Sequence, residues 1–309
     1  MKTEQKASII TALEAYIKEH GSTQDSISKN AGVNASYLIN MRKGDFTIKS
    51  GDKVVQIADK YFKRIATLIG FETEKQYWPT RHTLQLKEII SLLNDAKTNA
   101  EIAVITGETG CGKSYSAEIF RSKFPGDVFI VKVGSSDNLG DLLDKIIDAF
   151  GLEIYKRSKS AKLRQIAAYM KQLSEKGNEP TLMLDESEYM KQPALCALKE
   201  LYDVLNNWCA LVLIGTRQLT DNIEKLKKRN KPGIPQLYRR IKFRIRELPA
   251  IDRSFHDFLD GLQPDLKRWL QRNCDNYGEL HDVLVPAMRE AERTNQELSE
   301  DFVKLVLGV

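Results

Sequence analysis

Short apolar runs alternate with amphipathic stretches through the central part of the chain. Four runs have the length and composition of buried strands, at 102–106, 128–133, 181–184 and 209–215. Between them apolar residues recur at three- and four-residue spacing, as over 139–150, which predicts helices. Strands that alternate with helices in this way are typical of a doubly wound parallel sheet, so the pattern predicts an α/β fold.

The first 70 residues carry the helical period instead. An amphipathic pattern over 4–19 predicts one helix. Two shorter patterns follow over 24–31 and 34–43, separated by Gly32, and this arrangement is typical of a helix-turn-helix. Apolar positions that include Val54 and Val55 then complete what we expect to be an all-α domain.

The second helix of this motif would enter a major groove of DNA. The candidate contacts are residues near the bases, Asn34, Ser36, Tyr37 and Asn40, and residues near phosphate, Arg42 and Lys43. The alternative is that Asn34 is only a helix N-cap and that the unit docks on protein.

Domain boundaries follow from breaks in the periodicity. The segment 71–83 lacks a helical period and contains Pro79, so we expect a linker between a helix-turn-helix domain at 1–70 and a core at 84–250. From 251 to 309 apolar residues return at helical spacing and predict a small C-terminal helical lid.

A glycine-rich stretch lies between the first central strand and the next helix. It fits the pattern G-x-x-x-x-G-K-[ST] of a P-loop, in which backbone N–H groups and a lysine bind phosphates and a hydroxyl binds Mg²⁺. The predicted nucleotide-binding residues are Gly107, Glu108, Thr109, Gly110, Cys111, Gly112, Lys113, Ser114 and Tyr115. The alternative is a glycine-rich turn with no ligand.

The run 181–184 ends in Asp185 and Glu186, as in a Walker B strand. We expect Asp185 and Ser114 to hold Mg²⁺ and Glu186 to polarise the attacking water. Thr216 follows the strand at 209–215, where it could reach the γ-phosphate or water, or could simply cap the next helix.

Composition and charge narrow the possible functions. The chain is 42% hydrophobic and 29% charged, no apolar run approaches the roughly 20 residues that span a bilayer, and four scattered cysteines indicate reduced thiols. We therefore expect a cytoplasmic protein without a membrane partner. Lys and Arg outnumber Asp and Glu by eleven to three over 217–247 and by seven to one over 156–176, which favours a polyanion-binding face.

The order of these motifs resembles that of the AAA+ ATPases, and within them the Mu B-like transposition target-selection group. The resemblance rests on 107–114, 182–186, 211–216 and the paired arginines in 237–241, and it implies a P-loop AAA+ core. It also implies ATP and Mg²⁺ as cofactors, a homo-oligomer or helical filament on duplex DNA, and a transposase partner in a bacterial or phage-infected cell.

The same resemblance assigns roles to three further positions. Arg240, with Arg239 as the alternative, would reach into a neighbouring subunit's nucleotide. Thr216 stands where the group has asparagine, and His281 occupies the position of the sensor-2 arginine.

The resemblance also implies a DNA-binding surface on the core. The first candidate stretch is Lys156, Arg157, Lys159, Lys162 and Arg164, and a second basic stretch runs over 225–231. Neither is interleaved with aromatic residues in the manner of a single-strand stacking platform, which favours backbone contacts to duplex DNA. We therefore expect an ATP-dependent, non-sequence-specific DNA-binding ATPase that delivers target DNA to a transposase. The alternative is a nucleotide-switched DNA-binding regulator or replication-loader type ATPase.

Overall fold

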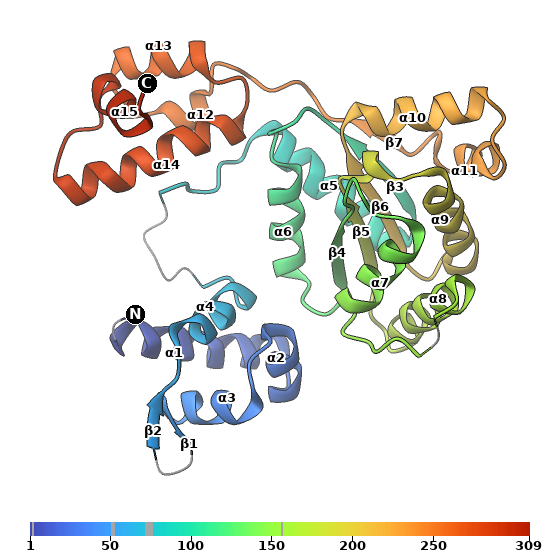
Figure 1. Cartoon of the computed structure of the whole chain (residues 1–309), viewed down its shortest axis with the longest axis horizontal. Helices are drawn as coiled ribbons and strands as arrows, with labels where there is room; N and C mark the ends of the chain where they lie inside the picture. Colours follow the sequence, from blue (N-terminus) through green and yellow to red (C-terminus); the bar gives the residue numbers. More distant parts are fainter. Residues whose placement is uncertain (2, 51–52, 72–76, 156) are drawn as a thin grey trace. The chain divides into compact units, whose positions relative to one another are not determined.

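The computed structural model describes residues 1, 3–50, 53–71, 77–155 and 157–309. It divides into two compact units, an N-terminal unit (Met1–Gln76) and a C-terminal unit (Tyr77–Val309) (Figure 1). Each unit has its own hydrophobic core. Over the described ranges, no helix has both the length and the apolar character needed to span a membrane.

The N-terminal unit contains four helices and a short hairpin over its described residues. The helices are α1 (Thr3–His20), α2 (Gln24–Ala31), α3 (Ala35–Arg42) and α4 (Asp59–Leu68). Gly32 ends α2 in the left-handed region at φ 59°, a conformation that suits glycine, and lets the chain turn into α3. Ile9, Leu13, Leu38 and Phe62 are fully buried in its core.

The expectation of an all-α unit is wrong at one place. Strands β1 (Thr47–Ser50) and β2 (Lys53–Gln56) form an antiparallel pair in which Ile48 lies opposite Val55. Val54 and Val55 are 66% and 45% exposed, so they do not complete a helical core. β-Branched residues such as Ile48, Val54 and Val55 favour paired strands over a helix, which accounts for the difference.

A five-stranded parallel sheet forms the centre of the C-terminal unit. Its strand order is β4-β5-β6-β3-β7. In chain order the strands are β3 (Ile102–Thr106), β4 (Val128–Lys132), β5 (Thr181–Asp185), β6 (Ala210–Gly215) and β7 (Ile245–Glu247). The predicted strand at 181–184 therefore lies directly beside the predicted strand at 209–215, and all five strands run in the same direction.

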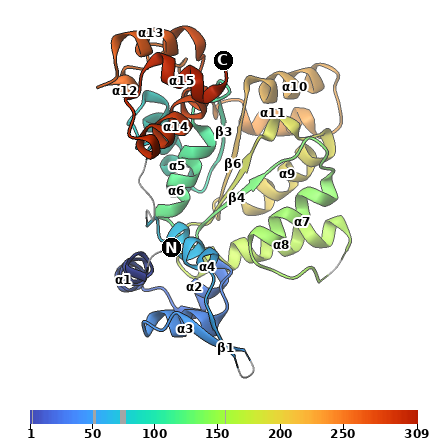
Figure 2. The ribbon, with the colours of Figure 1, turned by 60° about the vertical axis from the view of Figure 1, so that its left-hand side comes forward.

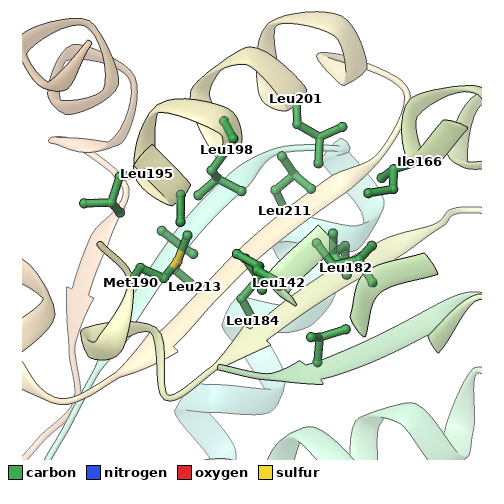
Figure 3. Close-up of a cluster of buried hydrophobic side chains, with 14 of the residues drawn as sticks. Leu142, Ile166, Leu182, Leu184, Met190, Leu195, Leu198, Leu201, Leu211 and Leu213 are labelled. Atoms are coloured by element: carbon green, nitrogen blue, oxygen red, sulfur yellow. The ribbon is translucent and has the colours of Figure 1, made fainter. Parts of the chain in front are cut away.

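Helices cover both faces of this sheet (Figures 1 and 2). One face packs on α5 (Leu84–Asn99) and α6 (Lys113–Lys123). The other packs on α7 (Leu139–Ala149), α8 (Lys159–Glu175), α9 (Gln192–Leu205), α10 (Arg217–Lys228) and α11 (Ile234–Ile241). On this second face, Leu195 and Leu198 of α9 lie over Leu211 and Leu213 of β6 in a cluster of buried apolar side chains (Figure 3).

The paired arginines lie on a helix. The family resemblance implies an arginine-finger turn at 237–241, but these residues belong to the helix α11. Pro235 stands in the first turn of α11, where its fixed φ favours helix initiation. Apolar and polar residues alternate over 242–248, a pattern that predicts a strand of seven residues. The observed strand β7 covers only Ile245–Glu247, and Phe243 lies outside it, 76% exposed.

Four helices form the C-terminal lid: α12 (His256–Leu259), α13 (Pro264–Asn273), α14 (Tyr277–Thr294) and α15 (Glu300–Leu307). Phe255, Leu266 and Leu280 belong to the same buried cluster as Ile89 and Phe120 of the core face. The lid therefore packs against the α5 and α6 side of the sheet.

Candidate functional site

The P-loop connects the buried end of β3 to the first turn of α6. Gly112 is the N-cap of α6 at φ 90° and offers no side chain to cap the helix, so the first N–H groups of α6 can serve an anion. The Lys113 Nζ donates to the carbonyl oxygens of Gly107 at 2.9 Å and Glu108 at 2.7 Å. The lysine ammonium thus closes the loop on itself, in the region where a phosphate would be bound.

Cys111 is 3% exposed beneath this loop. Burial raises the pKa of its thiol, while the neighbouring Lys113 opposes that shift. The thiol is therefore protonated at neutral pH and serves as a small packing residue within the loop.

The structure brings the two predicted metal ligands together at the end of β5. The Ser114 Oγ donates to the Asp185 Oδ2 at 2.6 Å, and the Asp185 Oδ1 accepts the backbone N–H of Glu186 at 2.9 Å. A hydroxyl beside a carboxylate is a hard oxygen donor set, the kind that suits Mg²⁺. These residues therefore fit the metal that the sequence predicts.

Glu186 follows in a strained backbone conformation. Its φ and ψ are 54° and 37°, the left-handed region that costs a non-glycine residue about 1 kcal/mol or more. Its carboxylate forms an ion pair with Lys132 at the end of β4, with 2.9 Å between the Lys132 Nζ and the Glu186 Oε1. The bond to Glu186 raises the pKa of Lys132.

Thr216 lies at the end of the next strand, β6. It is the N-cap residue of α10, yet its side chain makes no capping hydrogen bond. Its Oγ1 is buried and has no hydrogen-bond partner among the described residues. Thr216 therefore occupies the N-cap position that the alternative gave it, but it does not cap α10 through its side chain, and its hydroxyl keeps its capacity for a polar ligand.

The lid touches the P-loop at Gly110. The backbone N–H of Gly278, in the first turn of α14, donates to the carbonyl of Gly110 at 3.2 Å. Gly110 has a φ of 72°, and a Cβ placed on it would lie 2.1 Å from the Asn276 Oδ1. Only glycine therefore fits at Gly110 while Asn276 caps α14.

Tyr115 and His281 lie beside the segment that precedes α5. The Tyr115 hydroxyl is 2.5 Å from the Thr80 Oγ1. Trp78 stacks on Phe258 of the lid with 4.6 Å between ring centroids, and His281 packs on Trp78 in a T-shaped arrangement with 5.4 Å between centroids. His281 also approaches the Asp282 Oδ1 at 3.0 Å. This segment thus connects the start of α6 to the lid.

Arg240 is engaged within its own chain. Its Nε donates to the Asp203 Oδ1 at 2.5 Å, and Lys199 contacts the same carboxylate. The Arg240 side chain is 20% exposed, whereas Arg239 is an exposed residue. To reach a neighbouring subunit, Arg240 would have to leave Asp203.

The predicted DNA contacts on the core fall into three groups. Arg157, Lys159 and Arg164 are exposed. Lys162 is buried, with its Nζ 2.5 Å from the Asp144 Oδ1, so its ammonium holds α8 to α7 and is not presented to solvent. Lys156 lies outside the described residues.

The N-terminal candidates carry structural contacts of their own. Arg42 donates to both carboxylate oxygens of Glu14, and the bond to Arg42 lowers the pKa of Glu14. Asn34 caps α3 by accepting the N–H of Ser36, while Asn40 donates to the Thr47 carbonyl. Tyr37 packs on the ring of Tyr61. Lys43, which follows α3, is exposed.

Three residues at the site were not among the predictions. Lys132 contacts Glu186, Glu188 approaches Thr216, and Asn276 contacts Gly110. Lys132 stands at the end of a predicted strand, as Asp185 does, so its position along the chain was a usable signal. The other two contacts depend on packing and have no marker in the sequence.

Residues 96–223 match a family model described as an AAA domain. No curated protein matches the sequence. The fold is similar to that of Cdc6p from Pyrobaculum aerophilum, with 16% identity over 78% of this chain and 70% of that chain and a TM-score of 0.55. A structure titled replication initiator DnaA bound to AMPPCP and single-stranded DNA matches at 13% identity over 68% of this chain and 62% of that chain, with a TM-score of 0.42.

An AAA domain in general implies nucleotide binding, typically with Mg²⁺, and nucleotide hydrolysis. The chain thus contains a segment that matches an AAA domain model, and its parallel sheet with flanking helices has the P-loop AAA+ α/β fold.

Proposed function

We propose that this chain is an ATP-hydrolysing protein whose nucleotide state controls its assembly on duplex DNA, and that it delivers this DNA to a transposase. The observation that carries the proposal is the meeting of three strand ends around one position. Ser114, in the first turn of α6 after the P-loop, lies against Asp185 at the end of β5. Glu186 follows Asp185, and Thr216 follows the adjacent strand β6. Ligands bind at the carboxyl ends of strands in such sheets.

Each side chain has a defined task in this proposal. Lys113 leaves the loop carbonyls to contact the outer phosphates, and Ser114 and Asp185 hold Mg²⁺. The metal, when bound, neutralises charge on the phosphates. Glu186 leaves Lys132 to accept a proton from the attacking water, and the Thr216 hydroxyl donates to the water or the γ-phosphate.

The assembly part of the proposal uses the exposed arginines and lysines. Arg157, Lys159 and Arg164 contact DNA phosphates, which is expected to give binding without strong sequence preference. Arg239 or Arg240 completes the site of a neighbouring subunit in a head-to-tail homo-oligomer. Because Arg240 is bonded to Asp203, Arg239 is the more accessible of the two.

A variant at Lys113 tests this function. Lys113→Ala removes the ammonium from the P-loop, so ATP binding and ATP-dependent duplex-DNA binding should both be lost. The matched control is Lys123→Ala, an exposed lysine at the last turn of the same helix. Fluorescent-nucleotide titration and a filter-binding assay on two unrelated duplexes measure the two effects. Unchanged ATP affinity in Lys113→Ala contradicts the nucleotide site.

The second candidate function is a nucleotide-switched DNA-binding regulator or replication-loader type ATPase, in which no transposase takes part. The N-terminal helix-turn-helix geometry favours it, since such a unit can bind DNA independently of nucleotide. Deleting residues 1–70 separates the two candidates. Retained ATP-dependent DNA binding supports the first, and complete loss of DNA binding supports the regulator.

A further inference from the structure

Glu188 lies in the short 3₁₀ turn η1 (Ser187–Tyr189), which follows Glu186. Its carboxylate reaches the end of the neighbouring strand β6, where the Glu188 Oε2 is 3.3 Å from the backbone nitrogen of Thr216. Thr216 begins α10 without capping it through its own side chain. The free N–H groups and the dipole of a helix N-terminus favour a negative charge at this position.

The backbone of Gly215 makes room for this carboxylate. A Cβ on Gly215 would lie 2.5 Å from the Glu188 Oε2, closer than real side chains approach. The φ of Gly215 is not in the left-handed region, so space and not backbone conformation favours glycine here. A Cβ at this position would push the Glu188 carboxylate away from its present place, which makes Gly215 a handle on that contact.

We propose that Glu188 is a positioning residue that holds Thr216, and with it the start of α10, against the turn that carries Glu186. The inference rests on the proposed function, because it assigns Glu188 a task in hydrolysis. The Ser187 Oγ donates to the Leu184 carbonyl at 2.7 Å and fixes the turn to β5. With both ends fixed, Glu188 sets the distance between the Thr216 hydroxyl and Glu186.

Substitutions at both partners test the proposal in the full-length chain. Glu188→Ala removes the carboxylate, Glu188→Gln keeps an oxygen that can accept the Thr216 N–H, and Gly215→Ala displaces the carboxylate by its Cβ. The control is Glu200→Ala, an exposed glutamate on α9. The kcat and KM for ATP hydrolysis and the thermal unfolding midpoint are measured for each variant and for the Gly215→Ala/Glu188→Ala pair.

Glu188→Ala and Gly215→Ala should each lower kcat about tenfold or more, since misplaced catalytic groups are costly, while KM changes little. Glu188→Gln should retain most activity, and the double variant should be no slower than Glu188→Ala alone. The proposal is overturned if the loss of kcat in the double variant equals the product of the two single losses. It is also overturned if Glu188→Ala has the same kcat as the control Glu200→Ala. Equal inactivity of Glu188→Gln and Glu188→Ala also overturns it, because an oxygen that accepts the Thr216 N–H would then not be enough to position Thr216.

The unfolding measurement separates this inference from the proposed function. Gly215→Ala should destabilise the wild-type chain and be tolerated in the Glu188→Ala background, whether or not ATP is hydrolysed. Equal destabilisation in both backgrounds overturns the contact between Gly215 and Glu188. A wild-type chain that does not hydrolyse ATP overturns the proposed function and the role of Glu188 in it, and leaves the contact alone standing.

Discussion

Replacing Lys132 by methionine should speed ATP hydrolysis. In the structure the Lys132 Nζ is 2.9 Å from the Glu186 Oε1, so the carboxylate that would activate water is bound to a cation. Methionine keeps much of the length of the side chain and removes its charge. Glu186 should then reach its productive position without first breaking an ion pair.

The size of the effect follows from the exposure of the pair. The side chains of Lys132 and Glu186 are 70% and 36% exposed, and ion pairs in such positions are worth at most about 1 kcal/mol. That energy corresponds to about a fivefold change in an equilibrium at room temperature. We therefore expect kcat to rise by up to about fivefold, with ATP affinity unchanged because neither group binds the phosphates.

A steady-state phosphate-release assay at saturating ATP measures the change. Lys304→Met is the control, since Lys304 forms a partly exposed ion pair with Glu300 within α15, outside the site. Raising the salt concentration should reduce the difference in kcat between wild type and Lys132→Met, because salt screens exposed charges. A lower kcat in Lys132→Met would refute the reasoning and show that Lys132 assists the reaction.

Two further predictions concern the P-loop. Gly110→Ala should lower the lid's unfolding midpoint, measured by fluorescence of Trp78 where it stacks on Phe258. The left-handed φ costs an alanine about 1–2 kcal/mol, and the added Cβ displaces Asn276. The fall in the midpoint should be smaller in an Asn276→Ala background, and equal falls in both backgrounds would contradict the contact. Burial raises the pKa of the Cys111 thiol above that of a free thiol, so the fraction present as thiolate at pH 8 is low. Iodoacetamide should therefore modify buried Cys111 more slowly than half-buried Cys196. Mass spectrometry measures both rates, with the urea-unfolded chain as the control. Rapid labelling of native Cys111 would contradict its burial.

The elements that the sequence predicts well are those with a strong local pattern. The P-loop strand and the strand ending in Asp185 are continuous apolar runs, and the order of strands and helices implied the parallel sheet that the structure confirms. Because parallel strands end at one edge, the meeting of Ser114 with Asp185 also followed from the pattern.

The remaining features depend on contacts between distant segments. Asn276 meets Gly110 only because α14 packs over the P-loop, and nothing near either residue in the sequence marks the pair. The helix-turn-helix pattern predicted Arg42 as a phosphate contact, and the family resemblance with the local charge predicted Lys162 as a DNA contact. In the fold Glu14 lies beside Arg42 and Asp144 beside Lys162. Net charge along a segment does not reveal which cations are already paired.

The position of β3 inside the sheet has a consequence for how the chain folds during synthesis. β3 carries the P-loop, yet its partners β6 and β7 come later in the chain, and Thr106 pairs with Gly215. The ribosome therefore adds roughly 110 residues before the first partner of β3 exists, which takes about 5–20 s at ordinary rates of translation. During that interval Ile102, Val104 and Ile105, all fully buried in the finished sheet, lack their neighbouring strands. The nucleotide-binding loop is thus made early and acquires its shape late, so this stretch is where we expect a nascent chain to depend most on protection from aggregation.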